Sequence, residues 1–433
     1  MSESDFLLKN ATMVDGTVID VEVRATRISK MGMDIASELR VVDAKKNLLL
    51  PGLVDLHSHL REPGRENSES VLSGSQSAIK GGYTAVSAMA NTSPVADTAG
   101  VVEQVARLGK EAGLCDVFPI GAVTVGLKGE QLAELTAMAQ SAAKVRIFSD
   151  DGNCVSDPLL MRRALEYVKS FGGVIAQHAQ EPKLTVDAQM NEGEVSSRLG
   201  LKGWPAIAEE SIIARDILIA HYVQSRLHIC HLTTKGGVEL VRWAKSQGMA
   251  VTAEVTPHHL LLTDELAQNY DPVFKVNPPL RTTADVMALR AGLADGTIDI
   301  VATDHAPHPS EAKDCEWSAA AFGMIGLETA LSVVAESMVK TGLMDWSTLV
   351  QRMSTMPAAI GGYSEHGSIS LGGIANFIVV DPEGSWLVDK AQTFSRSSNT
   401  PFHGFTLPVS IIHTFYRGIH VLSNGQLTGM KYE

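Results

Sequence analysis

The residues best suited to chemistry are histidines and aspartates that follow short apolar runs. His57 and His59 follow one such run and are separated by a single residue. In a strand, residues i and i+2 point to the same side, so these two imidazoles can share a metal ion, and Arg61 continues on that face. A strand with two incidental histidines is the alternative interpretation of the pair taken alone.

More candidate ligands favour the metal site, because each of them ends an apolar run of its own. They are Asp151, His178, His231 and Asp304. Four histidines and two aspartates are enough for two divalent ions, and imidazole and carboxylate suit zinc, with manganese and cobalt also acceptable. A bridging carboxylate is needed between two ions; Asp151 is the first choice for it and Asp150 the alternative.

Such a centre predicts hydrolysis of an amide. Two divalent ions lower the pKa of bound water and polarise a carbonyl group, and Asp304 is placed to carry a proton from the attacking water to the leaving nitrogen. Two ions, two aspartates and a bridging hydroxide leave one positive charge. Together with Arg61, this charge would attract an anionic substrate.

Composition and charge exclude several other functions. The chain has 433 residues, of which 45% are hydrophobic and 20% charged, as in globular proteins. A net charge of −13 argues against nucleic acid or an anionic membrane as a partner. The N-terminus lacks a secretory signal, no apolar run approaches the length of a membrane span, and the four cysteines form no CxxC pair. We therefore expect a cytoplasmic protein.

Apolar runs of strand length alternate with amphipathic helical stretches from residue 51 to about 360. This alternation predicts a (β/α)8 TIM barrel, and an open doubly wound sheet is the alternative, weakened by the absence of a GxGxxG motif. The eight predicted strands are Val54–His59, Tyr83–Met89, Val117–Val123, Val145–Ser149, Val174–His178, Leu227–His231, Ala250–Val255 and Ile298–Thr303. The candidate ligands then lie at the C-terminal ends of these strands, where barrels carry their active sites.

Short strands separated by turn residues are predicted at both ends of the chain. They occupy residues 1–50 and 361–433, and neither set closes a core by itself. We expect the two ends to combine in one small β-sandwich module beside a barrel domain of residues 51–360.

Several stretches carry a resemblance to a known family. They are PGLVDLHSHLREPG at 51–64, GGYTAVSAMANTSPV at 81–95, FSDDG at 148–152, HICHLTTK at 228–235, VTAEVTPHHLLL at 251–262, FKVNPPLR at 274–281, IDIVATDHAPH at 298–308 and FGMIGLET at 322–329. With these motifs the chain resembles the amidohydrolase superfamily and, within it, the class I dihydroorotases, over nearly its whole length.

The resemblance implies an activity, a metal content and partners. Dihydroorotases interconvert N-carbamoyl-L-aspartate and L-dihydroorotate, the third step of pyrimidine biosynthesis. The resemblance implies two zinc ions per subunit, bridged by Asp151 and a hydroxide, with Asp304 as general acid/base. It further implies a homodimer and association with aspartate carbamoyltransferase.

Individual ligands and substrate contacts also follow from the resemblance. One zinc ion would be held by His57, His59, Asp151 and Asp304, and the other by Asp151, His178 and His231. The substrate would be contacted by His59, Arg61, Asn91, Asn277, His308, Phe322 and Gly323, with Arg61 and Asn91 on its carboxylate.

The residue at the bridging position differs between relatives of this family. Allantoinases, hydantoinases and many dihydroorotases of the other class carry a carboxylated lysine there. This chain has no lysine at the end of its fourth strand, and Lys144 lies at the start of that strand. We therefore expect no carboxylated lysine. The chain departs from the family at Ala90, at the Ala-Gln pair after His178 where Glu or Cys is frequent, and at Cys154 near the bridging loop.

Two other functions remain as alternatives. The first is allantoinase or hydantoinase activity, against which Arg61 and Asn91 argue, since hydantoins are uncharged. The second is an inactive barrel that serves as a partner of another pyrimidine enzyme, which is disfavoured because all six ligands are present. The remaining histidines of the motifs, His258, His259 and His305, are interpreted as structural or as neighbours of the ligands.

Overall fold

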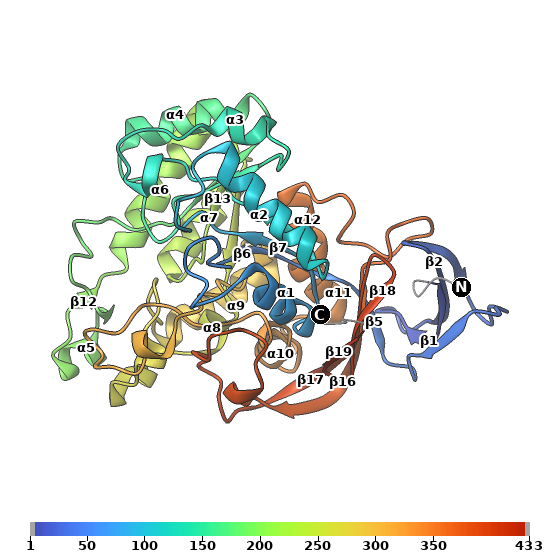
Figure 1. The fold of residues 1–433 in the computed structure, drawn as a ribbon. Helices are drawn as coiled ribbons and strands as arrows, with labels where there is room; N and C mark the ends of the chain where they lie inside the picture. Colours follow the sequence, from blue (N-terminus) through green and yellow to red (C-terminus); the bar gives the residue numbers. More distant parts are fainter. Residues whose placement is uncertain (1–4, 429–433) are drawn as a thin grey trace.

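The predicted (β/α)8 barrel is confirmed by the computed structural model, which describes residues 5–428 (Figure 1). Eight parallel strands form the barrel, and each lies within or close to a predicted run. They are β6 (Leu53–Ser58), β7 (Tyr83–Ala88), β8 (Asp116–Pro119), β9 (Ile147–Phe148), β10 (Val174–Gln177), β13 (Leu227–Ile229), β14 (Val251–Val255) and β15 (Ile300–Val301).

The barrel consists of two arcs that meet at two seams. One arc has the order β6-β7-β8 and the other β15-β14-β13-β10-β9. Single parallel bridges, Gly121 with Phe148 and Ser58 with His305, connect the arcs. At the second seam the amide of His59 donates to the carbonyl oxygen of His305 over 2.8 Å, so barrel closure brings the ends of β6 and β15 together.

Helices surround the barrel in the order expected for the fold. They are α1 (Val71–Lys80), α2 (Ala99–Ala112), α3 (Leu135–Gln140), α4 (Pro158–Lys169), α6 (Ile207–Val223), α7 (Lys235–Ser246), α9 (Thr283–Asp295), α10 (Ala330–Val334), α11 (Trp346–Val350) and α12 (Met356–Gly361). Turns of π-helix, Ala335–Val339 and Gln351–Thr355, continue α10 and join α11 to α12.

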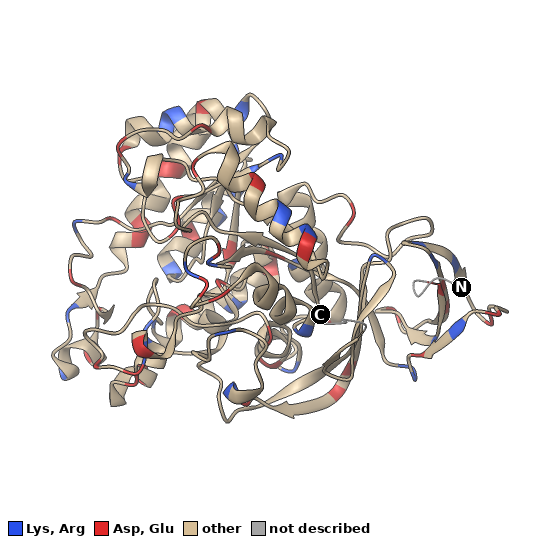
Figure 2. Cartoon of the chain, in the orientation of Figure 1, with Lys and Arg blue, Asp and Glu red and all other residues tan. Residues whose placement is uncertain are grey.

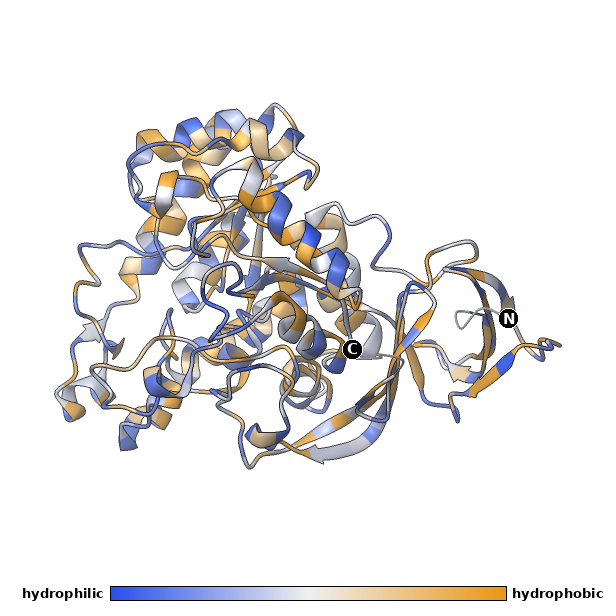
Figure 3. Cartoon of the chain, viewed as in Figure 1, coloured by the Kyte–Doolittle hydropathy of each residue, from blue (hydrophilic) through white to orange (hydrophobic). Residues whose placement is uncertain are grey.

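The start of α4 shows how local sequence sets these boundaries. Pro158 occupies its first turn, and the side chain of Asp157 accepts a hydrogen bond from the amide of Leu160 over 2.7 Å. Proline fits the first turn because it has no amide hydrogen to leave unpaired, and aspartate satisfies one of the free amides. Apolar and polar residues alternate along the outer helices (Figure 3), and charges of both signs are interspersed over them (Figure 2).

Shorter elements cover the C-terminal end of the barrel. An excursion between β10 and α6 contains β11 (Met190–Asn191), α5 (Glu194–Leu199) and β12 (Gly203–Trp204), and α8 (Pro257–Leu261) follows β14. Turns of 3-10 helix occupy Val125–Leu127, Asp264–Asn269, Pro272–Phe274, Ser310–Ala312 and Lys390–Gln392.

The two ends of the chain share one nine-stranded sheet, seen at the right of Figure 1. Its strands are β1 (Phe6–Thr12), β2 (Val18–Arg24), β3 (Arg27–Gly32), β4 (Arg40–Asp43), β5 (Leu48–Pro51), β16 (Phe377–Leu387), β17 (Thr406–Tyr416), β18 (Ile419–Ser423) and β19 (Gln426–Leu427). Strand β5 pairs with β16 in antiparallel register, Leu50 opposite Ile378. This pairing connects the N-terminal strands to the C-terminal strands.

The barrel and the sheet have separate hydrophobic cores. One cluster joins barrel strands all around the ring, including Val54, Ala85, Val174 and Ile300, to Ile360 of α12. Because its members come from opposite sides of the ring, this cluster fills the inside of the barrel. A second cluster, with Phe6, Phe377 and Phe415, lies within the sheet of the chain ends.

No helix within residues 5–428 combines the length and the apolar character needed to cross a membrane.

Candidate metal centre

The fold brings all six predicted ligands to the C-terminal end of the barrel. Each of them stands at the end of a strand or within three residues after it, and each is at most 5% exposed. The six come from five strands: His57 and His59 from β6, Asp151 from β9, His178 from β10, His231 from β13 and Asp304 from β15. Sequence spacing alone could not show that they converge; barrel closure makes them converge.

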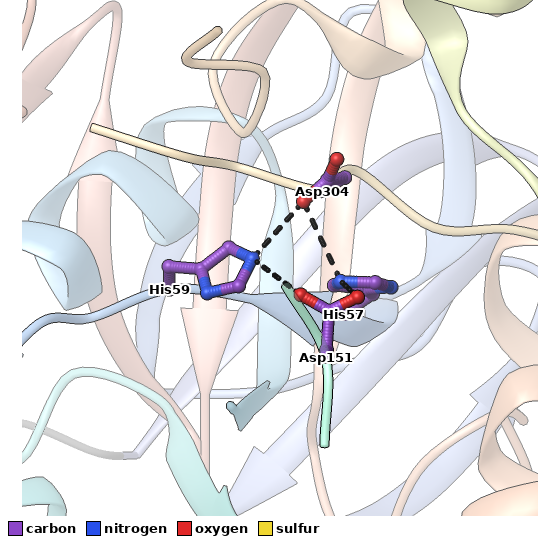
Figure 4. Close-up of side chains that lie close together, drawn as sticks. All are labelled: His57, His59, Asp151 and Asp304. Atoms are coloured by element: carbon purple, nitrogen blue, oxygen red, sulfur yellow. Dashed lines mark hydrogen bonds and ion pairs between the residues drawn. The ribbon is translucent and has the colours of Figure 1, made fainter. Parts of the chain in front are cut away.

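Four of these side chains form one group, shown in Figure 4. Oδ1 of Asp304 lies 3.1 Å from Nε2 of His59 and 3.4 Å from Nε2 of His57. Oδ2 of Asp151 lies 3.2 Å from Nε2 of His59. The potential ligand atoms of the four residues lie within 4.8 Å of one another, which is compact enough for a single ion.

A second group consists of Asp151, His178 and His231. Oδ1 of Asp151 lies 3.2 Å from Nδ1 of His178 and 3.1 Å from Nε2 of His231. The same oxygen lies 3.4 Å from Nε2 of His57 in the first group. Asp151 therefore belongs to both groups, which is the position that a bridging ligand requires.

The donor set fits divalent metal ions. Nε2 of His57 is buried and has no hydrogen-bond partner among the described residues, although it faces two carboxylates. Nδ1 of His178 and Nε2 of His231 face each other over 2.9 Å, and at most one proton fits between two ring nitrogens at that distance. Lone pairs that converge in this way, together with carboxylates, form a site for a cation with borderline ligand preference such as zinc.

The histidines and carboxylates of the centre shift each other's pKa values. Burial disfavours the charged form of His57, but the negative charges of Asp151, Glu254 and Asp304 outweigh it and raise the pKa of this imidazole well above its ordinary value. Burial raises and His57 lowers the pKa of Asp151, and the net result lies well below the ordinary value of a carboxyl group. The centre is therefore built to hold positive charge.

Unusual backbone conformations aim several of these side chains. Arg61, His231 and Asp304 have positive φ angles of 61°, 30° and 45°, which residues with a Cβ atom adopt at a cost. Asp55, on β6, accepts hydrogen bonds from the amide of Thr303 over 2.9 Å and from its hydroxyl group over 2.6 Å. This contact fixes the end of β15 immediately before Asp304.

Asp150, the alternative bridge, lies outside both ligand groups. Its Oδ1 accepts from the amides of Val123 and Thr124 over 2.8 and 3.0 Å, and its Oδ2 accepts from the hydroxyl group of Thr124. Asp150 thus anchors the loop after β8 and turns its carboxylate away from the histidines.

Glu254 is a residue of the site that the sequence analysis missed. This buried carboxylate of β14 accepts from Nδ1 of His57 over 2.5 Å and from Nε2 of His228 over 3.0 Å. It therefore holds the His57 ring with Nε2 directed toward Asp151 and Asp304. The signal in the sequence was a single carboxylate in the middle of an apolar strand, which is rarely left unpaired. The sulfur of Cys230 lies within 4.8 Å of the potential ligand atoms of His57 and Glu254.

Two of the predicted substrate residues, Arg61 and Asn91, lie beside the first group. Nε of Arg61 donates to the carbonyl oxygen of Pro307 over 3.2 Å, and its terminal nitrogens have no hydrogen-bond partner among the described residues. Burial lowers the pKa of Arg61 to about 10, so its guanidinium group is charged at neutral pH. Oδ1 of Asn91 accepts from Nδ1 of His59 over 2.9 Å, so Asn91 also orients a potential ligand.

Asn277 contacts the second group through an intermediate residue. Its Nδ2 donates to Oε1 of Gln180 over 3.3 Å, and the same oxygen accepts from Nε2 of His178 over 2.7 Å. The resemblance to the family assigned Asn277 to the substrate alone, and the structure adds this path to His178.

His308, Phe322 and Gly323 form a hydrogen-bonded unit on the loop after β15. Nε2 of His308 donates to the carbonyl oxygen of Phe322 over 2.7 Å, and the amide of Gly323 donates to the carbonyl oxygen of Lys275 over 3.0 Å. Burial and the charge of Arg61 lower the pKa of His308 to about 3, so this imidazole is neutral at pH 7. Gly323 has a φ of 143°, and a Cβ atom there would lie 2.8 Å from Nε2 of His308.

The other histidines of the motifs have mainly structural contacts. His305 donates to Glu69 over 3.3 Å, and His259 donates to the carbonyl oxygen of Pro278 over 3.1 Å. His258 differs, because its buried Nε2 has no hydrogen-bond partner among the described residues. Burial lowers the pKa of His258 to about 4.

Comparison with known proteins agrees with this geometry. The model of a family described as dihydro-orotase-like matches residues 46–237. The chain is 64% identical to a dihydroorotase of Streptomyces coelicolor over 98% of this chain and 100% of that protein. It is 52% identical to a dihydroorotase of Mycobacterium tuberculosis over 95% of this chain and 97% of that protein.

Solved structures give the same fold. An L-hydantoinase (dihydropyrimidinase) from Arthrobacter aurescens matches with a TM-score of 0.87 and 25% identity, over 98% of this chain and 97% of that chain. A dihydropyrimidinase from Brevibacillus agri matches with a TM-score of 0.83 and 20% identity, over 98% and 96% of the two chains. With its His/Asp centre at the mouth of the barrel, the chain belongs to the dihydroorotase family of metal-dependent amidohydrolases.

Proposed function

We propose that this protein is a dihydroorotase that interconverts N-carbamoyl-L-aspartate and L-dihydroorotate with loss or gain of water. The observation that carries the proposal is the pair of ligand groups that share Asp151 beside the guanidinium group of Arg61. High identity to dihydroorotases over nearly the whole chain supports this substrate over other cyclic amides.

Two divalent metal ions, with zinc as our choice, would occupy the two groups. His57, His59, Asp151 and Asp304 would hold one ion, and Asp151, His178 and His231 the other. When bound, the ions polarise the amide carbonyl group and make water a nucleophile near neutral pH. Asp151 would bridge the two ions without a carboxylated lysine. Lys144, at the other end of the strand, is exposed.

Asp304 is the proposed general acid/base. Burial raises its pKa, but His57 and His59 outweigh burial and keep its pKa below the ordinary value, so the group starts as a carboxylate. In the hydrolytic direction it accepts a proton from the attacking water and delivers it to the ring nitrogen as the amide bond breaks. In the synthetic direction it takes a proton from the ureido nitrogen and returns it to the departing oxygen.

Arg61 and Asn91 are the proposed carboxylate-binding residues. The terminal nitrogens of Arg61 are free to form a bidentate pair with the carboxylate group of the substrate. Asn91 uses its oxygen on His59, which leaves its NH2 group to donate to the same carboxylate. Recognition of the carboxylate separates dihydroorotate from the uncharged hydantoins.

His308, Asn277 and the backbone at Phe322 and Gly323 are proposed to surround the ring. His308 donates through Nε2 to the loop, so Nδ1 remains an acceptor. The carbonyl oxygen of Phe322 and the amide of Gly323 already have partners, so we expect the amide of Phe322 to be the backbone donor to the substrate.

We also propose that the protein works in the cytoplasm as a homodimer associated with aspartate carbamoyltransferase, which makes its substrate. The resemblance to class I dihydroorotases supports the assembly, and four unpaired cysteines suit a reducing compartment. Light scattering of the purified protein, alone and mixed with aspartate carbamoyltransferase, tests both associations.

The test of function is the hydrolysis of L-dihydroorotate before chelation, after chelation and after zinc is added back. We expect activity to disappear with chelation and to return with zinc. Turnover of allantoin or hydantoin without turnover of dihydroorotate would replace the proposed substrate. Absence of both activity and metal in the purified protein would favour a non-catalytic barrel.

A further inference from the structure

A row of hydrogen bonds runs from Thr185 through Gln180 to both His178 and Asn277. The row contains one hydroxyl group, two amides and one imidazole, and each of these groups has a fixed number of donors and acceptors. The direction of every bond in the row can therefore be worked out from one end.

Thr185 sets the direction. Its hydroxyl group donates to the carbonyl oxygen of Glu181 over 3.2 Å, and the residue is buried. A hydroxyl group has a single proton, which here points at the carbonyl oxygens of Glu181 and Pro182, the latter 3.4 Å away. In the 2.8 Å contact between Thr185 and Gln180, the amide of Gln180 therefore donates and the hydroxyl oxygen accepts. The NH2 group of Gln180 therefore faces Thr185, and its oxygen faces the metal centre.

The oxygen of Gln180 then determines its two neighbours. It is 2.7 Å from Nε2 of His178 and 3.3 Å from Nδ2 of Asn277, and an amide oxygen only accepts. Nε2 of His178 must carry the proton, which leaves the lone pair of Nδ1 directed at Asp151 and His231. The NH2 group of Asn277 must face Gln180, which leaves Oδ1 of Asn277 as a buried acceptor without a partner among the described residues.

We propose that Gln180 is a positioning residue that determines which atoms of His178 and Asn277 donate and which accept hydrogen bonds. It thereby acts on the metal centre and on the substrate pocket together. It fixes His178 in the tautomer that binds metal through Nδ1. It also fixes Asn277 in the orientation that presents an acceptor, which fits an N–H group of a cyclic amide. The second part rests on the proposed function, and the first part depends only on metal binding.

A glutamate at position 180 provides the conservative exchange. A carboxylate also accepts from both His178 and Asn277, and the hydroxyl group of Thr185 can turn to donate to it. Leucine at this position can accept from neither. The pair Gln180→Glu and Gln180→Leu therefore separates loss of the acceptor from any change of side-chain size. A second control, Gln247→Leu, lies at the exposed end of α7 on the far side of the barrel and tests the effect of the apolar exchange itself.

The first measurement is titration of the chelated full-length protein with Co²⁺ alone, followed by its visible absorption and by competition with a chelator. We expect Gln180→Leu to weaken the second equivalent about 10- to 100-fold, as is usual when the partner of a metal-binding histidine is lost. Gln180→Glu should stay within about threefold of the wild type, since it keeps the acceptor. Equal affinity of Gln180→Leu and wild type for both equivalents would overturn the proposal.

Thr185 supplies a second, independent variant, which also covers the case in which Gln180→Leu does not fold. Thr185→Val removes the acceptor for the NH2 group of Gln180, so the amide is free to rotate. Thr185→Ser keeps the hydroxyl group. We expect Thr185→Val to bind the second Co²⁺ more weakly than Thr185→Ser does, and equal affinities of the two would contradict the direction assigned to the row.

The second measurement is the KM for L-dihydroorotate of the Co²⁺-saturated variants. Gln180→Leu should have a raised KM even at metal saturation, because Asn277 is no longer held, whereas Gln180→Glu should restore it. An unchanged KM in Gln180→Leu would contradict the proposal that Gln180 orients Asn277. If the wild type does not turn over dihydroorotate, the proposed function fails, while the Co²⁺ titration still tests the role of Gln180 at His178.

Discussion

At the mouth of the barrel, residues of the same type have different roles. Asp150 and Asp151 are adjacent and chemically identical, yet one anchors a loop and the other lies in both ligand groups. One end of the Asn91 amide contacts His59, and one end of the Asn277 amide contacts Gln180 beside His178. In the proposed function the other end of each amide would bind the substrate, so substrate and metal would depend on the same side chains.

Arg61→Ala tests substrate recognition at this scale. Loss of a charge-assisted pair costs about 1.5–3 kcal/mol, so we expect the KM for dihydroorotate to rise about 10- to 150-fold. Metal content should not change, because Arg61 lies outside both ligand groups. Arg65→Ala, which removes a nearby exposed arginine, is the matched control. Steady-state kinetics and metal analysis check the prediction, and an unchanged KM in Arg61→Ala would contradict it.

Metal binding should release protons. The pKa of His57 is raised well above its ordinary value of 6.5 by Asp151, Glu254 and Asp304, against the effect of burial, so the metal-free centre holds a proton at pH 7. A metal ion must displace that proton. We expect a positive release at pH 7 that declines as the pH rises through the raised pKa, because the imidazole is then neutral already. A pH indicator in weak buffer measures it; no release at pH 7 would refute the prediction.

Glu254→Gln tests the support of His57. The amide keeps the shape of the side chain but removes the charge that stabilises the oriented imidazole, so metal affinity should fall about 10- to 100-fold. Asp299→Asn is a matched control, because this buried carboxylate accepts from Ala253 and Lys245 at the opposite end of the barrel. The control should lower thermal stability without changing metal affinity, and equal metal affinities of Glu254→Gln and wild type would dismiss the role.

At the scale of elements, the site depends on the seam between β6 and β15. A single bridge joins these strands, and the contacts of Asp55 with Thr303 reinforce them. Because the ends of both strands carry potential ligands, the seam sets the distance between His59 and Asp304.

Thr303→Val tests the seam. The substitution preserves shape and removes the hydroxyl donor, which leaves the buried Asp55 with one partner fewer. We expect a loss of about 1–3 kcal/mol in the free energy of unfolding, measured by denaturant titration of the chelated protein. A loss below about 0.5 kcal/mol, the range of ordinary surface substitutions, would mean that Asp55 does not hold the seam.

At the scale of the whole molecule, the sheet of the chain ends depends on β16. This strand pairs with β5 on one side and with β17 on the other, and Val379 lies opposite Leu49 and His413. It is the only described strand that connects the N-terminal strands to β17, β18 and β19.

Val379→Pro should disrupt this connection. Proline cannot donate to a neighbouring strand, and in a helix interior the same defect costs about 3 kcal/mol or more, which we take as the scale here. Val379→Ala removes only packing and serves as the control. Thermal unfolding should show a larger loss for the proline variant than for the alanine variant. Equal losses would mean that strand pairing at this position contributes little.

Much of the fold and of the site could be predicted from the sequence. The barrel strands were visible as apolar runs, and the six potential ligands stand directly after them. Helix α1 is harder to predict, because its segment, VLSGSQSAIK, contains three serines and a glycine, which lower helix propensity. The excursion with β11, α5 and β12 is hard to predict because its elements are too short to show a period.

The partners of the ligands were harder to predict than the ligands. Glu254 contacts His57 and His228 across different strands, and spacing along one strand does not reveal such contacts. Gln180 lies only two residues after His178, but the sequence does not show that its side-chain oxygen faces Nε2 of that histidine. Asp151 is the first choice over Asp150 from the sequence, but the physical reason for the difference, the anchoring of Asp150 by Thr124, needs the fold. The domain boundaries at residues 50 and 361 stay a prediction.

The shared sheet has a consequence for the way the protein is made. More than 300 residues separate β5 from β16, which covers its edge. At a ribosomal rate of roughly 5–20 residues per second, about 15–60 s pass between the synthesis of these two strands. During that interval the edge of β5 stays open, and an open edge is a template for strands of other chains. Division of one sheet between the two ends of the chain thus sets a minimum time during which each nascent molecule is vulnerable to aggregation.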